Sequence, residues 1–87
     1  MTLYAFADMI ESRVSLMRHA YGSGWGACLE FVDEQHDGGI SSINGQGATP
    51  DAAMASLAKN LAGKRIVIGW STTDVARYKV PKDLRHE

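Results

Sequence analysis

The chain has 87 residues, 45% of them hydrophobic and 22% charged, which is the balance of one small globular domain and excludes a disordered chain. No apolar run is long enough to span a membrane, and no basic N-terminal segment leads into an apolar run. The single cysteine, Cys28, cannot form an internal disulfide, so we expect a reducing compartment and place the protein in the cytoplasm.

The net charge is −1, but the charged residues are unevenly placed. Residues 1–60 hold three lysines and arginines against seven carboxylates, whereas residues 61–87 hold six against three. Such asymmetry can mark a surface that meets a partner. Because neither part is strongly charged, we expect instead that the two parts neutralise each other across a single domain, residues 1–87.

The first element predicted in the chain is an amphipathic helix over residues 2–20. Apolar residues recur there at steps of three and four, which is the period of one helix face. Thr2 is the expected N-cap, and Gly22 and Gly24 are expected to end the helix. The apolar positions are Leu3, Phe6, Ile10, Val14 and Met17.

A β-hairpin is predicted next. Residues 25–33 alternate, with Trp25, Ala27, Leu29 and Phe31 on one face. Residues 37–39 read Asp-Gly-Gly and form the turn, and Ile40 opens the second strand. Since Ile40 and Ile43 cannot lie on one face of a regular strand, we expect a bulge or an exposed apolar residue in that strand.

The second helix is the best delimited element. Thr49 is the expected N-cap, Pro50 suits the first helical position, and Asp51 suits the positive end of the helix dipole. Gly63 is expected just after the C-cap. The buried stripe consists of Met54, Leu57, Ala58 and Leu61.

Residues 65–70 and 75–81 form two further predicted strands, joined by a turn at 71–74 and ended by Pro81. The predicted order is therefore α-β-β-α-β-β. This order predicts an α+β fold, with a four-stranded, mostly antiparallel sheet and two helices packed on one face.

The Gly45-Gln46-Gly47 segment before the second helix resembles a phosphate-binding loop only in part. A dinucleotide fingerprint needs a third glycine where Pro50 stands, and a phosphate loop needs a lysine at the helix start. Asp51 would also repel a phosphate. We therefore interpret the two glycines as structural, allowing the strand to bend into the helix.

No pattern in the sequence indicates catalysis, a metal or a cofactor. The candidate ligands and nucleophiles are His19, Cys28, Asp33 and His36, and no two of them have the spacing of a metal site. A cysteine within a strand is typically a small packed hydrophobe. We therefore predict a protein that is not an enzyme and that holds no cofactor.

The C-terminal strands interleave cations with aromatic residues, which could bind nucleic acid by stacking and charge. Trp70 continues the apolar alternation of its strand and is expected in the core. The other residues of this pattern are Arg65, Arg77, Tyr78 and Lys79. Nucleic-acid binding is the second functional hypothesis.

The leading hypothesis is a protein-interaction module whose partner is another protein or protein complex. Carboxylates gather on the predicted hairpin, next to the two isoleucines of which one should be exposed. The predicted partner-binding residues are Glu30, Asp33, Glu34, Asp37, Ile40 and Ile43. A free edge strand could also join two copies of the chain as a homodimer.

One pattern in the chain consists of a strand, an Asp-Gly-Gly turn, a strand, a Gly-x-Thr-Pro-x-x-Ala helix and a Gly-Lys step. This pattern resembles two groups of proteins. One is the HicB-type antitoxins, and the other is the small accessory proteins of bacteriophages, including type I anti-CRISPR proteins. The phage resemblance implies a protein that binds and blocks a host macromolecular complex in the bacterial cytoplasm. The residues concerned are Asp37, Gly38, Gly39, Gly47, Thr49, Pro50, Ala53, Gly63 and Lys64.

Overall fold

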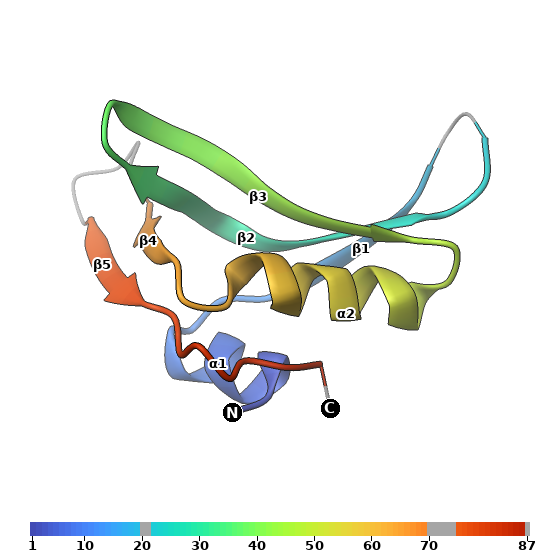
Figure 1. Cartoon of the computed structure of the whole chain (residues 1–87), viewed down its shortest axis with the longest axis horizontal. Coiled ribbons are helices and arrows are strands. Elements are labelled where there is room, and N and C mark those ends of the chain that lie inside the picture. The colour runs from blue at the N-terminus through green and yellow to red at the C-terminus, as the bar shows by residue number, and fades with distance from the viewer. Residues whose placement is uncertain (20–21, 70–74, 87) are drawn as a thin grey trace.

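The computed structural model describes residues 1–19, 22–69 and 75–86, which form two helices and five strands (Figure 1). In chain order the elements are α1 (Leu3–Met9), β1 (Val14–Arg18), β2 (Trp25–His36), β3 (Gly39–Gly47), α2 (Pro50–Leu61), β4 (Arg65–Ile68) and β5 (Ala76–Lys79). Every pairing between these strands is antiparallel. The predicted α+β class with two helices and an antiparallel sheet is confirmed, but the sheet has five strands where four were predicted.

The additional strand, β1, lies in the segment predicted to be helical, so the prediction of one helix over residues 2–20 is wrong. Thr2 does cap α1, because its side-chain oxygen accepts a hydrogen bond from the Ala5 amide at 3.1 Å. The helix ends after Met9 in a Schellman motif, in which the Ser12 amide donates to the Ala7 carbonyl and the Glu11 amide donates to the Asp8 carbonyl.

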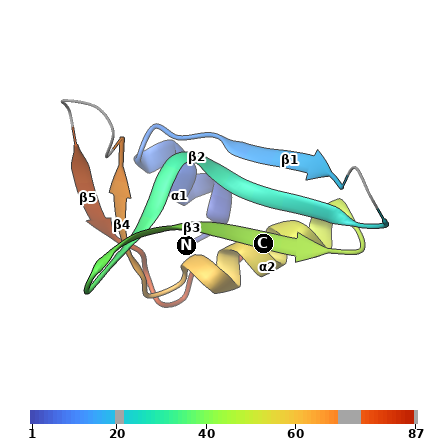
Figure 2. The same ribbon diagram turned by 90° about the horizontal axis from the view of Figure 1, so that it is seen from above.

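Strand β2 organises the sheet by changing partners along its length. Its first half lies between β1 and β3, and its second half lies between β4 and β3. β1 and β4 therefore share one edge of β2, and β2 bends where one gives way to the other (Figure 2). The register with β3 shifts between Cys28 and Asp33, where four residues of β2 face the single residue Ile43.

Helix α2 packs directly on β3 through Gly45 and Gly47. A methyl group at Gly45 would collide with the backbone of Ala53 and Leu57, and one at Gly47 would collide with Ala52. The two glycines are two residues apart, so both face the helix. Their role is close packing of α2 on β3, which agrees with the structural interpretation but differs from the bend that was predicted.

The boundaries of α2 are confirmed. The Thr49 hydroxyl accepts a hydrogen bond from the Ala52 amide at 3.1 Å, and Pro50 occupies the first turn. At the other end Gly63 has a φ of 76°, in the left-handed region that favours glycine after a helix.

Both helices lie on the same side of the sheet (Figure 1), and their apolar faces share one core with the sheet. The C-terminal segment completes this core with Val80 and Leu84. It also pairs with the start of the chain, because the Leu3 amide donates to the Arg85 carbonyl at 2.7 Å. None of the described helices is both long and apolar enough to cross a bilayer.

The two C-terminal strands pair as predicted, but each is shorter than the prediction. β4 ends at Ile68 and β5 ends at Lys79. The turn predicted at residues 71–74 and the core position predicted for Trp70 lie outside the described residues.

Candidate interaction site

A groove of about 170 Å³ opens where β2 changes partners. It combines the turn after α1 with the irregular part of β2 and the end of β4. We call it the bulge groove and define it by Glu11, Ser12, Arg13, Glu30, Phe31 and Ile68. Among the described residues, two that are not glycine have a positive φ, Glu11 at 55° and Phe31 at 62°. Both of them line the bulge groove.

Phe31 is the most exposed large hydrophobic residue of the described chain, with 78% of its surface accessible. A bulky side chain is unfavourable at positive φ, and an exposed ring gains nothing from burial. The conformation is fixed by the sheet, since the Phe31 carbonyl accepts a hydrogen bond from the Gly69 amide at 3.0 Å. Phe31 therefore combines a strained backbone conformation with an exposed ring, and strained residues cluster at functional sites.

Glu30 holds one wall of the groove in place. Its carboxylate accepts hydrogen bonds from the Ser15 hydroxyl at 2.9 Å and from Arg13 Nε at 3.0 Å, and it forms an ion pair with Arg13 Nη2 at 2.8 Å. The hydrogen bond from Ser15, followed by those from Arg13, lowers the pKa of Glu30 below its ordinary value. The Glu30 carbonyl accepts a further bond from the Ser12 hydroxyl, so the turn after α1 is tied to β2 by several polar contacts.

Cys28 lies half-buried on the face of the sheet that is turned away from the helices, next to Ser15 on β1 and Asn44 on β3. It is less buried than the packed hydrophobe that was predicted. Burial, with a smaller effect of the Glu30 charge, raises the pKa of the thiol. A neutral thiol is a weak nucleophile. The described residues contain no group of three or more histidine, cysteine and carboxylate side chains that could hold a metal ion.

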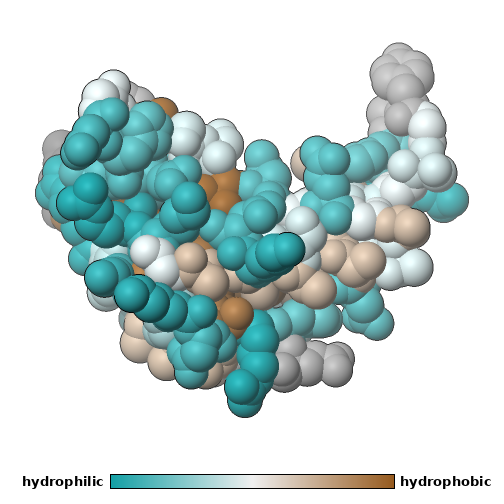
Figure 3. Space-filling view, in the orientation of Figure 1, coloured by the Kyte–Doolittle hydropathy of each residue, from teal (hydrophilic) through white to brown (hydrophobic). Residues whose placement is uncertain are grey.

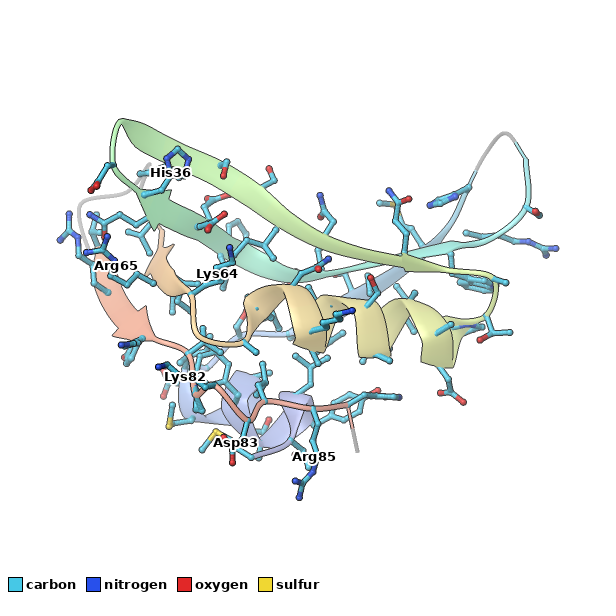
Figure 4. All side chains as sticks on the ribbon, in the orientation of Figure 1. His36, Lys64, Arg65, Lys82, Asp83 and Arg85 are labelled. Carbon is cyan, nitrogen blue, oxygen red and sulfur yellow. The ribbon has the colours of Figure 1, made fainter. Side chains whose placement is uncertain are left out.

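The carboxylates predicted to form one acidic cluster are divided between two places, and three of them pair with cations. Glu30 lies in the bulge groove with Arg13. Glu34 contacts Lys64 at 3.2 Å and Asp37 contacts Arg65 at 3.9 Å, at the other end of the sheet. Lys64 and Arg65 lie at this hairpin end (Figure 4), which is largely hydrophilic (Figure 3). The expected neutralisation between the acidic and basic parts of the chain is thus observed at these two pairs.

The two isoleucines of β3 have different environments. Ile43 is 7% exposed and belongs to the core, whereas Ile40 is 38% exposed next to the turn. The expected exposed apolar residue is therefore Ile40, and Ile43 cannot act as a surface anchor in the folded protein. Three positions separate Ile40 from Ile43, so the extended β3 places them on opposite faces, and the β-bulge itself lies in β2, opposite Ile43.

The cations of the C-terminal strands gather on one face. Arg65 pairs directly with Lys79 across the ladder, and Arg77 lies two residues from Lys79 on the same side of β5. Tyr78 points to the opposite face and is 40% exposed. The basic pattern in the sequence thus forms a small cationic face, but Tyr78 is not part of it.

Sequence reasoning missed Phe31, because strict alternation places it inward with Trp25, Ala27 and Leu29. These three residues do face the core side, and the bulge turns Phe31 out of the series. The phase conflict between Ile40 and Ile43 was the available signal. It predicted a bulge or an exposed apolar residue in the second strand; the exposed residue, Ile40, lies in that strand, but the bulge lies in the first strand, β2.

Comparisons of the chain with protein-family models, with curated proteins and with solved structures find no match.

Proposed function

We propose that this protein is a small, non-enzymatic interaction module that binds another protein through the bulge groove, with Phe31 as the anchor. The observation that supports this proposal is the exposure of Phe31 in a strained backbone conformation. An exposed aromatic ring surrounded by polar groups is the usual composition of a binding hot spot.

The surroundings of Phe31 favour a protein partner. Ile68 provides an apolar neighbour, while Arg13, with 82% of its side chain exposed, provides a polar rim. The bonds between Glu30, Ser12, Ser15 and Arg13 keep the groove ordered before a partner arrives, which reduces the entropic cost of binding.

The resemblance to phage accessory proteins suggests what such a module would do. In this proposal the partner is a component of a host defence complex, and binding blocks it without chemistry. The single cysteine supports the reducing cytoplasm as the place of action.

Nucleic-acid binding is the second candidate, and the cationic face formed by Arg65, Arg77 and Lys79 favours it. Three cations are a small footprint compared with proteins that hold nucleic acid mainly through phosphate contacts. One of the three, Arg65, also lies close to Asp37.

The proposal is tested by capturing proteins from a lysate of the bacterial host cells. The bait is immobilised wild-type protein or, in parallel, the immobilised Phe31→Gly variant. We expect the wild type to retain a defined protein, and Phe31→Gly to retain at least about tenfold less of it, as for loss of a hot-spot residue.

The matched control is Tyr4→Ala, which removes another exposed aromatic ring, 53% accessible, from α1. This variant should capture the same protein as the wild type. Capture that survives Phe31→Gly, or capture of nucleic acid alone, would refute the proposal.

A further inference from the structure

The sheet has three free edges among the described strands, at β1, β3 and β5. Free edges expose unpaired backbone groups and invite pairing with another chain, so proteins usually protect them. β5 is short and cationic, and one outward carbonyl of β3 is occupied by a side chain of α2, whereas no contact of the described residues covers the edge of β1. This difference points to β1 as an interface.

The edges of β5 and β3 are protected in different ways. β5 is four residues long, carries Arg77 and Lys79, and is followed shortly by Pro81. On β3 the Asn44 carbonyl accepts a hydrogen bond from the Asn60 side chain of α2 at 2.7 Å. Short length, cations and covering side chains are the usual means of preventing edge pairing.

The edge of β1 is open. The Arg13 carbonyl accepts from the Glu30 amide and the His19 amide donates to the Gly24 carbonyl, so these residues face β2. In an antiparallel ladder the direction alternates, and the backbone groups of Val14, Leu16 and Arg18 therefore point away from the sheet. Within the described residues these outward groups have no hydrogen-bond partner. Figure 2 shows β1 along the outer side of the sheet.

The side chains of β1 favour association. Leu16 is 41% exposed and Met17 is 69% exposed. Arg18 is the single charged residue within β1, and its guanidinium lies 6.0 Å from the centre of the Trp25 ring on its own chain. The edge therefore combines unpaired backbone groups with exposed apolar side chains.

We propose that β1 pairs with β1 of a second copy of this chain, antiparallel and centred on Leu16, to form a two-fold symmetric dimer with a continuous sheet. In this register Leu16 faces Leu16 of the second copy, and Arg18 faces Val14 of the second copy. All outward backbone groups of Val14, Leu16 and Arg18 are then paired, and the arginines of the two strands stay apart. The choice of a second copy rests on the side chains, because the exposed Leu16 meets its own copy and the one charged residue of each strand lies opposite an apolar Val14, so the edge is self-complementary as a two-fold interface requires.

The first test is the molecular mass in solution, measured by analytical ultracentrifugation over a range of concentrations. A five-residue edge is a small interface, so we expect a weak dimer whose mass rises from 9.4 kDa toward twice that value as concentration increases. Leu16→Lys places two lysines opposite each other, and it should raise the dissociation constant at least about tenfold.

The control is Ile40→Lys, which makes the same kind of change at an isoleucine of similar exposure on β3, and it should dimerise like the wild type. A wild type that stays monomeric at all concentrations would overturn the proposal. So would a dimer that Leu16→Lys leaves intact, or one that Ile40→Lys weakens equally.

The second test fixes the register by disulfide cross-linking in a Cys28→Ser background. Leu16→Cys should form a linked dimer on oxidation, because directly opposed residues have Cα atoms about 5.5 Å apart, within the range of a disulfide. Arg18→Cys should not, because the two copies of residue 18 are offset by four positions, or about 14 Å. Equal cross-linking of the two variants, or no cross-linking of Leu16→Cys, would contradict the proposed pairing.

Discussion

At the scale of single residues, Phe31 is the position where stability and function are expected to conflict. Its φ of 62° disfavours any side chain with a Cβ atom, whereas glycine adopts it freely. Phe31→Gly should therefore be more stable than Phe31→Ala by about 1 kcal/mol, measured as the free energy of unfolding in urea. Because the ring is 78% exposed, neither variant loses core packing. Equal stability of the two would mean that Phe31 is not held in the left-handed region.

Glu30 gives a pH-dependent prediction at the same scale. Its pKa is lower in the folded protein than its ordinary value, so its ionised form stabilises the fold at neutral pH. This contribution is complete above the unfolded pKa of about 4.3 and is lost as the pH falls through the lower folded pKa. Glu30→Gln should therefore lose less stability than the wild type below about pH 4, because it has no carboxylate to protonate at this position. The measurement is thermal unfolding across pH 2 to 7. Asp8→Asn, at a carboxylate with no hydrogen bond or ion pair in the described structure, is the control and should retain the wild-type acid profile.

At the scale of elements, the contact between β3 and α2 depends on the absence of side chains. Gly45→Ala should destabilise the fold by about 1–3 kcal/mol, because the new methyl group meets the backbone of Leu57 and Ala53 and forces the helix away. Gly26→Ala is the matched control, since its methyl group would meet the His19 ring at an ordinary distance of 3.4 Å. The measurement is the urea midpoint of each variant. A Gly45→Ala protein as stable as Gly26→Ala would show that α2 does not pack closely on β3.

The comparison of α1 with α2 shows how much of the fold could be predicted from sequence. α2 was delimited correctly because Thr49, Pro50 and Gly63 act locally, through hydrogen bonds and backbone conformation. α1 was extended by eleven residues beyond Met9, since no glycine marks its end and Glu11 takes the left-handed position instead. Pairing with β2, a tertiary interaction, then makes residues 14–18 a strand.

The candidate site shows the same limit. Glu30 was identified from its charge, but its bonds to Arg13 and Ser15 join residues far apart in the sequence. The exposure of Phe31 arises from a bulge that depends on three strands meeting on β2. Local periodicity does not show which strands pair with β2. The groove could therefore not be predicted from the sequence.

At the scale of the whole molecule, the distribution of charge separates the two functional hypotheses. We expect no measurable binding of single- or double-stranded oligonucleotides at physiological salt, measured by fluorescence anisotropy. Binding through Arg65, Arg77 and Lys79 would instead weaken steeply with salt, because phosphate contacts release counterions. Oligonucleotide binding with such a salt slope, abolished by reversing these three charges, would replace the leading hypothesis with the second.

The most direct test of the proposed function is the affinity for the captured partner, measured by titration calorimetry for three proteins. These are the wild type, Phe31→Gly, and the triple variant Arg65→Glu, Arg77→Glu and Lys79→Glu. We predict that Phe31→Gly loses about 2 kcal/mol of binding free energy, or about 30-fold in affinity, while the triple variant stays close to the wild type. Wild-type affinity in Phe31→Gly together with loss of binding in the triple variant would contradict this prediction.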